Sequence, residues 1–376
     1  MIQMVSLGDI CDIKIGRTPP RKQPQWFSES HGIKWVSIKD MGNTGKYISQ
    51  TSEFLTADAI KKFNIPIIPA GTLLMSFKLT VGRLGFTEYD MCSNEAIAQL
   101  PIKDPDIVDK NYLYYYLKNF NFGSLSSTSS IATAVNSKTV KNISVNLPPL
   151  DRQKKIANIL GSLDEKIELN RRMNETLEQL GQALFRHYFV DNPEAKSWES
   201  GTLGDIVVNF DSRRKPLSSK QRAKMQGDYR YFGATSVMDH VNDYLFDGTY
   251  LLLAEDGSVM RSDGTPYLQY VWGRFWVNNH AHIIQAKYPF TVEYLYLLLA
   301  KTNVQSLVSG AVQLKINQRA MNSLVISIPP DDLVIKFCNL VNSLFAQYRE
   351  NEGQIELLVN LRDSLLPKLI SGEVEI

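Results

Sequence analysis

Hydrophobic and polar positions along the chain follow two different periods. In residues 1–150 and 197–330, short apolar runs alternate with polar residues and are broken by Gly, Pro, Asn and Asp. The runs Ile33–Ile38 and Tyr250–Ala254 are examples. Such runs predict short β-strands joined by turns, with a few helices among them. We therefore expect two strand-rich globular domains.

Each of these stretches is followed by a segment in which apolar residues recur at steps of three and four. The spacing predicts long helices over 151–196 and 331–376, each entered just after a Pro-Pro pair, which a helix tolerates at its start but not inside. A helix with an apolar seam needs a partner, and the other helix is the nearest one. Because the intervening domain must return the chain, we expect an antiparallel coiled coil. The seam positions are Ile156, Leu160, Leu163, Ile167, Asn170, Asn174, Leu177, Gly181, Leu184 and Tyr188 in the first helix, and Val334, Phe337, Val341, Leu344, Tyr348, Asn351, Ile355, Leu358, Arg362, Leu365 and Leu369 in the second.

Self-comparison shows an internal repeat. Four short matches occur in the same order in the two halves, and one chance match would not explain four. The sequence therefore predicts an α+β protein in which two pseudo-repeated domains, 1–150 and 197–330, are separated by the two paired helices. The matches are Leu7–Ile10 with Leu203–Ile206, Asn94–Ala96 with Asn279–Ala281, Tyr112–Tyr114 with Tyr294–Tyr296, and Leu147–Pro149 with Ile328–Pro330.

The repeat also predicts the register of the helix pair. It maps Asn170 onto Asn351, so we expect these two side chains to face each other. The same register places Leu163 near Leu358 and Leu177 near Leu344. A buried Asn in a seam costs stability but fixes register and spacing. The alternative is that both asparagines lie exposed at the rim.

Composition and charge exclude several classes of protein. Among 376 residues, 41 Lys and Arg oppose 39 Asp and Glu, which excludes a generally basic coat but not local basic patches. No apolar run is long enough to span a membrane, and the start lacks a secretory signal. Cys11, Cys92 and Cys338 lie far apart, which argues against a zinc site or disulfides and indicates a reducing, cytoplasmic location.

The chain lacks the motifs of the relevant enzymes. We find no Gly-rich cofactor loop, no phosphate-binding loop and no adenine-methyltransferase motif. Asp164–Lys166 resembles part of a nuclease motif, but it falls in a predicted helix and is expected to be a solvated face. His280 and His282 have a spacing that suits a metal, yet no third ligand is evident, which favours a structural or DNA-facing role. We expect no catalytic residue, no metal and no cofactor.

Basic residues cluster at matching places of the two halves. Turn-rich loops that carry Arg and Lys beside Ser and Thr have the groups needed for phosphate contact and base reading. A solvated loop is the alternative for any one run. Glu255 and Asp256 either accept from cytosine amino groups or cap a turn. The candidate DNA-binding residues are Lys14, Arg17, Thr18, Arg21, Lys22, Lys39, Lys78, Arg83, Ser130 and Thr133 in the first half, and Arg213, Arg214, Lys215, Ser219, Lys220, Arg222, Glu255, Asp256 and Lys315 in the second.

Three stretches carry a family resemblance: Leu147–Ala157, Leu163–Arg172 and Tyr244–Gly248. With them, the whole chain resembles the specificity subunits of type I restriction-modification systems. The resemblance implies two target recognition domains in a non-catalytic subunit, each reading one half of a bipartite sequence in double-stranded DNA. It also implies that two modification (methyltransferase) subunits dock along the helices, and that restriction subunits join the full complex.

Two alternatives remain at this point. One is a specificity subunit of a system in which methylation and cleavage share one polypeptide. A coiled-coil adaptor whose globular ends bind proteins is the structural rival.

Overall fold

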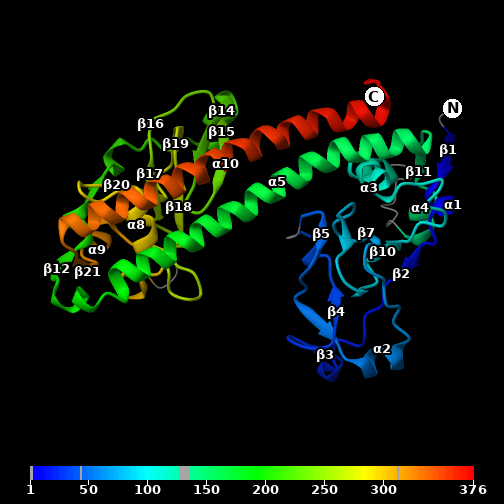
Figure 1. Cartoon of the computed structure of the whole chain (residues 1–376), viewed down its shortest axis with the longest axis horizontal. Coiled ribbons are helices and arrows are strands. Elements are labelled where there is room, and N and C mark those ends of the chain that lie inside the picture. Colours follow the sequence, from blue (N-terminus) through cyan, green and yellow to red (C-terminus); the bar gives the residue numbers. More distant parts are fainter. Residues whose placement is uncertain (1–2, 43–44, 127–135, 311–312) are drawn as a thin grey trace. The chain divides into compact units, whose positions relative to one another are not determined.

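The computed structural model describes residues 3–42, 45–126, 136–310 and 313–376. The chain forms two compact units, here called unit 1 (residues 1–171 and 352–376) and unit 2 (residues 172–351). Each unit contains one strand-rich domain and part of both long helices (Figure 1). Among the described residues, none of the helices is both long and apolar enough to cross a membrane.

The domain of unit 1 is built on two sheets and a strand pair. Its first sheet has the order β2-β10-β7-β8-β5 and its second the order β3-β6-β4-β9, while β1 pairs with β11. The strands are β1 (Gln3–Ser6), β2 (Lys14–Ile15), β3 (Phe27–Ser28), β4 (Ile33–Val36), β5 (Tyr47–Ile48), β6 (Glu53–Leu55), β7 (Leu73–Ser76), β8 (Leu84–Thr87), β9 (Cys92–Ser93), β10 (Ile97–Leu100) and β11 (Ser144–Leu147). The short helices are α1 (Leu7–Ile10), α2 (Ala57–Phe63), α3 (Lys110–Lys118) and α4 (Ser137–Lys141).

The domain of unit 2 repeats this plan. Its sheets have the orders β13-β20-β17-β18 and β15-β14-β19-β16, and β12 pairs with β21. The strands are β12 (Glu199–Thr202), β13 (Val207–Asn209), β14 (Gln226–Phe232), β15 (Val237–Val241), β16 (Phe246–Asp247), β17 (Tyr250–Ala254), β18 (Leu268–Val271), β19 (Arg274–Val277), β20 (Ala281–Ala286) and β21 (Val325–Ile328). The short helices are α6 (Leu203–Ile206), α7 (Ser219–Lys224), α8 (Val292–Leu299) and α9 (Gln318–Asn322).

Equivalent local structures confirm the internal repeat. The matched Leu-Gly-Asp-Ile segments form α1 and α6, and each begins with a capping box, Ser6 with Asp9 and Thr202 with Asp205. In each unit a parallel strand pair, β4 with β9 and β14 with β19, lies in the second sheet. The apolar runs of β7 and β17 are buried throughout, as expected for central strands.

The structure corrects one of the four predicted matches by a residue. The backbone N–H of Asn94 donates to a carbonyl of β4, and that of Asn278 to a carbonyl of β14. The Asn94 side chain accepts from the N–H of Ala96, and the Asn278 side chain from the N–H of His280. Asn94 is therefore equivalent to Asn278 rather than to Asn279. The equivalence follows from the backbone hydrogen bonds, which the amino-acid sequence alone does not show.

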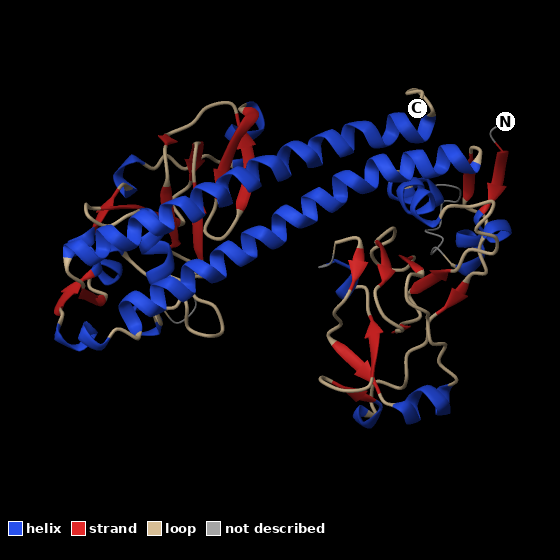
Figure 2. Cartoon of the chain, in the orientation of Figure 1, coloured by secondary structure: helices blue, strands red, loops and turns tan. Residues whose placement is uncertain are grey.

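The two long helices are α5 (Leu150–Phe185) and α10 (Asp331–Ser371) (Figure 2). A π-helical turn (Arg186–Val190) and a 3₁₀ turn (Pro193–Ser197) follow α5, so the regular helix ends well before residue 196. All described positions of both predicted seams are buried or half-buried. The helices run antiparallel, as the hydrogen bonds between them show.

The register differs from the predicted one by about one turn. Asn351 donates to Asn174 across 2.8 Å, and Asn170 donates to Gln354 across 3.1 Å. Asn170, Asn174 and Asn351 are all buried, which excludes the rim-exposed alternative. A repeat does not require its equivalent residues to face each other, and here each Asn faces a residue about one turn beyond its repeat equivalent. The four predicted partners Leu163, Leu177, Leu344 and Leu358 are half-buried.

A tyrosine and an arginine attach α5 to its neighbours in unit 1. The Tyr115 hydroxyl of α3 donates to Asp164 across 2.7 Å, and Arg362 of α10 donates to the other oxygen of Asp164, also across 2.7 Å. Burial would raise the pKa of Asp164, but these donors outweigh it and hold that pKa below its ordinary value. The expectation that Asp164 belongs to a solvated face was wrong, because its helix face is covered by α3 and α10.

In unit 2, a tyrosine of β18 and an arginine of α10 similarly bind one carboxylate, which belongs to α8. Tyr270 of β18 donates to Glu293 across 2.7 Å, and Arg349 donates to the same carboxylate across 3.0 Å. Tyr296 of α8 donates to Glu178 of α5 across 2.5 Å. Each recognition-type domain is therefore fastened to the long helices by tyrosine–carboxylate contacts.

Candidate nucleic-acid interface

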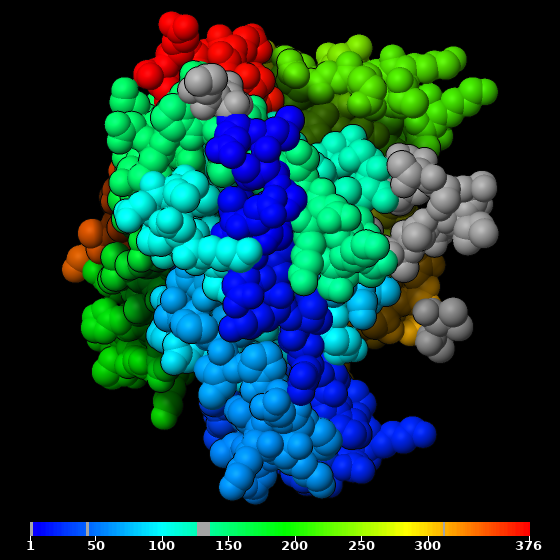
Figure 3. Space-filling model, turned by 90° about the vertical axis from the view of Figure 1, so that its right-hand side faces the viewer, coloured from blue at the N-terminus to red at the C-terminus, as the bar shows by residue number. Residues whose placement is uncertain are grey.

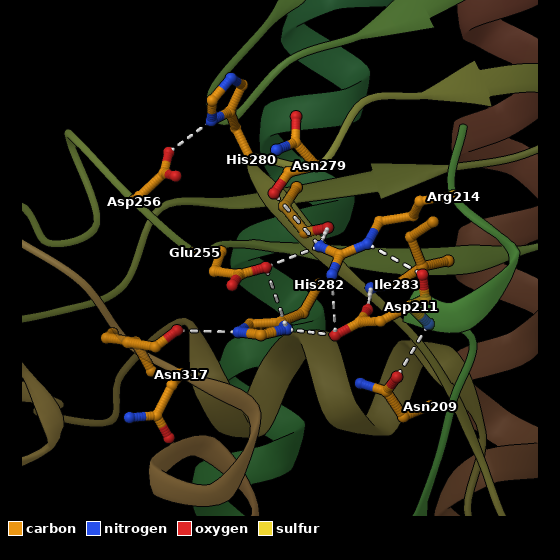
Figure 4. Close-up of polar contacts among 12 residues, drawn as sticks. Asn209, Asp211, Arg214, Glu255, Asp256, Asn279, His280, His282, Ile283 and Asn317 are labelled. Atoms are coloured by element: carbon orange, nitrogen blue, oxygen red, sulfur yellow. Dashed lines mark hydrogen bonds and ion pairs between the residues drawn. The ribbon is translucent and has the colours of Figure 1, made fainter. Parts of the chain in front are cut away.

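The basic loop of unit 2 folds onto a buried cluster of charged side chains (Figure 4). Asp211 follows β13, Arg214 lies three residues later, Glu255 follows β17, and His282 lies on β20. Asp211 stands opposite His282 because β13 and β20 are antiparallel neighbours whose pairing continues past Asn209. The strand ends of one sheet thus bring four ionisable side chains together.

Short polar contacts connect these four side chains, which we call the charged cluster. His282 Nδ1 lies 2.5 Å from Asp211, and Arg214 lies 2.6 Å from Glu255 and 3.6 Å from Asp211. Lys315, exposed at the edge, lies 3.2 Å from the second oxygen of Glu255. Only 1% of the His282 side chain is exposed, so its bonds are shielded from water. The cluster ties the loop after β13 to the ends of β17 and β20.

Both ring nitrogens of His282 make polar contacts. Its Nδ1 faces the carboxylate of Asp211, and its Nε2 lies 2.8 Å from the carbonyl oxygen of Ile316. Both ring nitrogens therefore have a polar partner, and the ring is fixed between the loop after β13 and the segment that precedes α9.

The two carboxylates of the cluster are stabilised as anions. Burial would raise the pKa of Asp211, but hydrogen bonds from His282 and the Ile283 backbone, together with Arg214, hold that pKa below its ordinary value. Burial opposes ionisation of Glu255 as well, and its hydrogen bond with Arg214 and the charge of His282 again lower the pKa. Both acids are thus expected to be charged at neutral pH.

Asp211, Glu255 and His282 also have the spacing of a cation site. One ligand atom from each lies within 4.8 Å of the others. However, the guanidinium of Arg214 already contacts both carboxylates, and both nitrogens of His282 have hydrogen-bond partners. Arg214 therefore supplies the positive charge that a metal would bring, and the group fits an internal ion cluster better than a metal centre.

The equivalent place in unit 1 is apolar. Ile15 stands opposite Ala98 as Asp211 stands opposite His282, and Phe77 donates its backbone N–H to Ala96 as Glu255 does to His280. The counterparts of the acid, the second acid and the imidazole are thus Ile15, Phe77 and Ala98, which pack in the apolar core of unit 1. The fold itself does not require charges at these positions.

The predicted arginines mostly hold loops in place. In unit 1, Arg17 donates to the carbonyls that end α2, Arg21 binds Glu53 and stacks on two aromatic rings, and Arg83 donates to the carbonyl of Ile38. In unit 2, the two predicted arginines outside the charged cluster also hold loops in place. Arg213 donates to the carbonyl of Leu245, and Arg222 forms an ion pair with Asp239 at 2.9 Å.

The predicted lysines are exposed, and two of them also form ion pairs, Lys14 with Asp12 and Lys315 with Glu255. Figure 3 shows one face of unit 1, on which the blue N-terminal segment that carries two of them lies at the surface. Ser219 accepts weakly from Arg222, at 3.4 Å, and Thr18 donates to Glu95. Ser130 and Thr133 lie outside the described residues. The exposed lysines are Lys14, Lys22, Lys39, Lys78, Lys215, Lys220 and Lys315.

Two features of this surface were missed from the sequence. The candidate set omitted Asp211 and His282, although the position of Asp211 just after a strand and ahead of three basic residues was a usable signal. Leu79, at the tip of the loop between β7 and β8, is 95% exposed with φ of +59°, a rare conformation for leucine. No sequence pattern marks such a conformation.

Two equivalent domains joined by paired helices define a class of internally duplicated two-domain protein. The family model described as "Type I restriction modification DNA specificity domain" matches residues 2–179 and 195–333. The chain belongs to this family. As a member it is a non-catalytic specificity subunit rather than an enzyme.

Two of the following known proteins resemble the chain over nearly all of its length, and one resembles a short part of it. The type I restriction enzyme MjaIX specificity subunit of Methanocaldococcus jannaschii is 26% identical over 410 aligned positions, which cover 98% of this chain and 93% of that protein. The type I restriction enzyme HindI specificity subunit of Haemophilus influenzae is 51% identical over 53 residues, 14% of this chain and 12% of that one. The crystal structure of the type I restriction-modification S subunit from M. genitalium has a TM-score of 0.62 at 16% identity, covers 98% of this chain and 96% of that one, and shares the fold.

Proposed function

We propose that the chain reads a bipartite target in double-stranded DNA, with one half-site for each recognition domain. The observation that carries this proposal is the pair of equivalent domains whose strand ends bear different side chains. The same strand ends are apolar in unit 1 and charged in unit 2. A protein that recognised a symmetric target would not need such a difference, whereas two unlike half-sites require it.

Exposed lysines support the DNA contact. The seven lysines of the predicted loops are exposed, and lysine contacts DNA mainly as a point charge on the phosphates. The braced arginines fix the loops that present these lysines. We therefore assign the lysines to backbone binding, and assign base reading to the side chains between them.

Exposed apolar side chains on the long helices support the docking of partners. In unit 1, Leu357 and Leu361 of α10 are 67% and 43% exposed, one turn apart. In unit 2, Met173 and Leu180 of α5 are exposed two turns apart. We propose that these surfaces bind two modification subunits, with restriction subunits completing a cytoplasmic complex.

Copurification tests the proposed docking of the modification subunits. The double change Leu357→Glu with Leu361→Glu should weaken capture of the modification subunit, and Asn360→Glu should not.

A long-read methylome of cells that carry the modification subunit, with and without this gene, tests the proposal. The expected result is a split motif, methylated on adenine only when the gene is present. Expression of both proteins without a gene-dependent motif would overturn the DNA-reading role and favour the coiled-coil adaptor. Identification of the copurifying partners separates a modification subunit from one polypeptide that methylates and cleaves.

Salt dependence tests the lysine assignment. Once the motif is known, the affinity of the purified complex for a duplex carrying it is measured over a range of salt concentrations. Each phosphate contact contributes about 0.9 to the slope of log K against log salt, so Lys78→Ala and Lys215→Ala should each reduce the slope by about that amount. Lys196→Ala, an exposed lysine outside the predicted loops, is the matched control. A flat salt response of the wild type would contradict direct DNA binding.

A further inference from the structure

A second histidine lies above the charged cluster and is directed outward. His280 precedes β20, and its Nδ1 lies 2.7 Å from Asp256, which follows β17. The His280 side chain is 45% exposed, whereas that of Asp256 is 18% exposed. In Figure 4 the other ring nitrogen of His280 points away from Asp256. The carboxylate therefore orients a ring whose Nε2 edge faces outward.

The backbone around this pair is fixed by hydrogen bonds. The N–H of His280 donates to the buried side chain of Asn278 across 2.8 Å, and its carbonyl accepts from the N–H of Glu255 across 2.9 Å. The backbone of Asp256 also pairs with that of Lys315 in an isolated antiparallel β-bridge. Below the pair, the charged cluster holds Glu255 and β20 together. His280 is thus preorganised, and a ligand would not have to order it on binding.

The equivalent positions in unit 1 have no such pair. The counterpart of His280 is the buried Ala96, and the counterpart of Asp256 is Lys78. The same backbone hydrogen bond from β7 to Ala96 forms without a histidine or an acid. Folding of the domain therefore does not explain the His280–Asp256 pair, and a role at the surface does.

We propose that His280 determines specificity in the second recognition domain, with its Nε2 in contact with a base edge in the major groove and Asp256 as its positioning residue. This inference rests on the proposed function. A ring with one proton keeps it on Nδ1, facing Asp256, so Nε2 is an acceptor. An acceptor at that place selects an exocyclic amino group, as on adenine or cytosine. The half-site read by unit 1 does not depend on this pair.

Variants at two positions test the inference through the methylated motif. In cells with the modification subunit, His280→Ala should relax one base position of one half-site and leave the other half-site unchanged. His280→Gln, which places an amide near the position of Nε2, should restore part of the preference at that position. Asp256→Asn should relax the same position less, because an amide oxygen still accepts from Nδ1–H.

Binding measurements with the purified complex give the size of the effect. Affinity is measured for the wild-type target and for a duplex changed at the relaxed base pair. The wild-type complex should discriminate between the two about 2- to 13-fold more strongly than His280→Ala, as expected for one hydrogen bond. His240→Ala, an exposed histidine on β15 of the same unit, is the matched control and should leave discrimination unchanged. Thermal unfolding establishes that each variant is folded.

The outcomes separate the two proposals. If the wild type directs a split motif and His280→Ala keeps that motif unchanged, the role of His280 is overturned while DNA reading stands. Relaxation at several positions of both half-sites would also overturn it, because it would indicate a general loss of affinity. If the wild type directs no motif, the proposed function itself fails.

Discussion

The two recognition domains share the order of four strands in the first sheet, β2-β10-β7-β8 and β13-β20-β17-β18, but carry different side chains at the strand ends. Where unit 1 packs Ile15, Phe77 and Ala98 into its core, unit 2 holds two acids and an imidazole around an arginine. The backbone hydrogen bonds that position both sets are equivalent. Main-chain pairing therefore determines the domain, and the strand ends tolerate either chemistry. The same main-chain pairing therefore accepts apolar or charged side chains at these strand ends without a change of fold.

Removing the imidazole of His282 should change the stability of unit 2 more than any other change considered below. In His282→Ala the side chain of Asp211 loses its closest partner inside the protein, and breaking one side of a buried ion pair costs about 3–5 kcal/mol. We expect the free energy of unfolding of unit 2 to fall by about that amount. Chemical denaturation gives the size, and hydrogen exchange of peptides from β20 locates it. A loss below about 1 kcal/mol would show that the charged cluster does not stabilise the domain.

Replacing the whole charged cluster by the residues of unit 1 tests whether the backbone of unit 2 accepts the apolar set. The variant Asp211→Ile, Glu255→Phe and His282→Ala carries the three counterparts of unit 1. It also carries Arg214→Thr, because Thr18 follows Ile15 at the same distance as Arg214 follows Asp211. Apolar replacement of a complete buried ion cluster is often neutral. Its unfolding free energy should lie closer to that of the wild type than that of His282→Ala does. A variant less stable than the single change would mean that the backbone of unit 2 is specialised for charges.

The tyrosine–carboxylate contacts occur in both units, so their contributions to the unfolding free energy of each unit can be compared. Asp164→Ala removes the acceptor of Tyr115 and one of the two carboxylates that bind Arg362, and Glu293→Ala removes the carboxylate that Tyr270 and Arg349 share. Each change should cost about 1–3 kcal/mol in the unfolding free energy of its own unit. Hydrogen exchange resolves the two units, and Asp164→Asn is the milder control because its oxygen still accepts from Tyr115. A loss confined to the other unit would contradict the assigned contacts.

Acid should weaken the charged cluster of unit 2 before its counterpart in unit 1. The folded-state pKa values of Asp211 and Glu255 are lowered, so their contribution to stability is present above the unfolded-state values of about 4 and is lost as the pH falls below them. In the four-residue replacement these two groups are gone, and the acid limb of the stability profile should be shallower. Denaturation between neutral pH and pH 3 measures both profiles. Identical acid limbs would show that other carboxylates dominate.

Much of the fold follows from the sequence for identifiable reasons. The heptad seams predicted both long helices because burial repeats at a fixed spacing, and the Leu-Gly-Asp-Ile repeat predicted the duplication because each copy caps the same short helix. The register of the helix pair was displaced by a turn, since interdigitation is a property of two surfaces. Asp164 was misjudged because its covering partners, Tyr115 and Arg362, are far away in sequence.

The candidate interface was less predictable than the fold. Charge runs do not distinguish an arginine that braces a loop from a lysine that faces solvent, because the partners are distant carbonyls and acids. The carboxylate of Glu255 was a candidate for base reading, yet it lies between Arg214 and Lys315. His282 and Asp211 meet only through strand pairing. Side-chain roles at strand ends thus depend on register, which the sequence leaves open within a residue or two.

The asparagines of the helix seam should give the smallest effect. A double-mutant cycle on Asn174 and Asn351, each changed to Leu, should show a coupling energy of about 0.5–1.5 kcal/mol, since one hydrogen bond of 2.8 Å joins them. Either single change leaves an amide facing an apolar side chain, whereas the double change restores a matched seam. The double variant should therefore be no less stable than the singles but less strict in register. Disulfide cross-links between cysteine pairs introduced along α5 and α10 report which residues of the two helices face each other. If the double variant forms the same cross-links as the wild type, the leucines and not the asparagines determine the register.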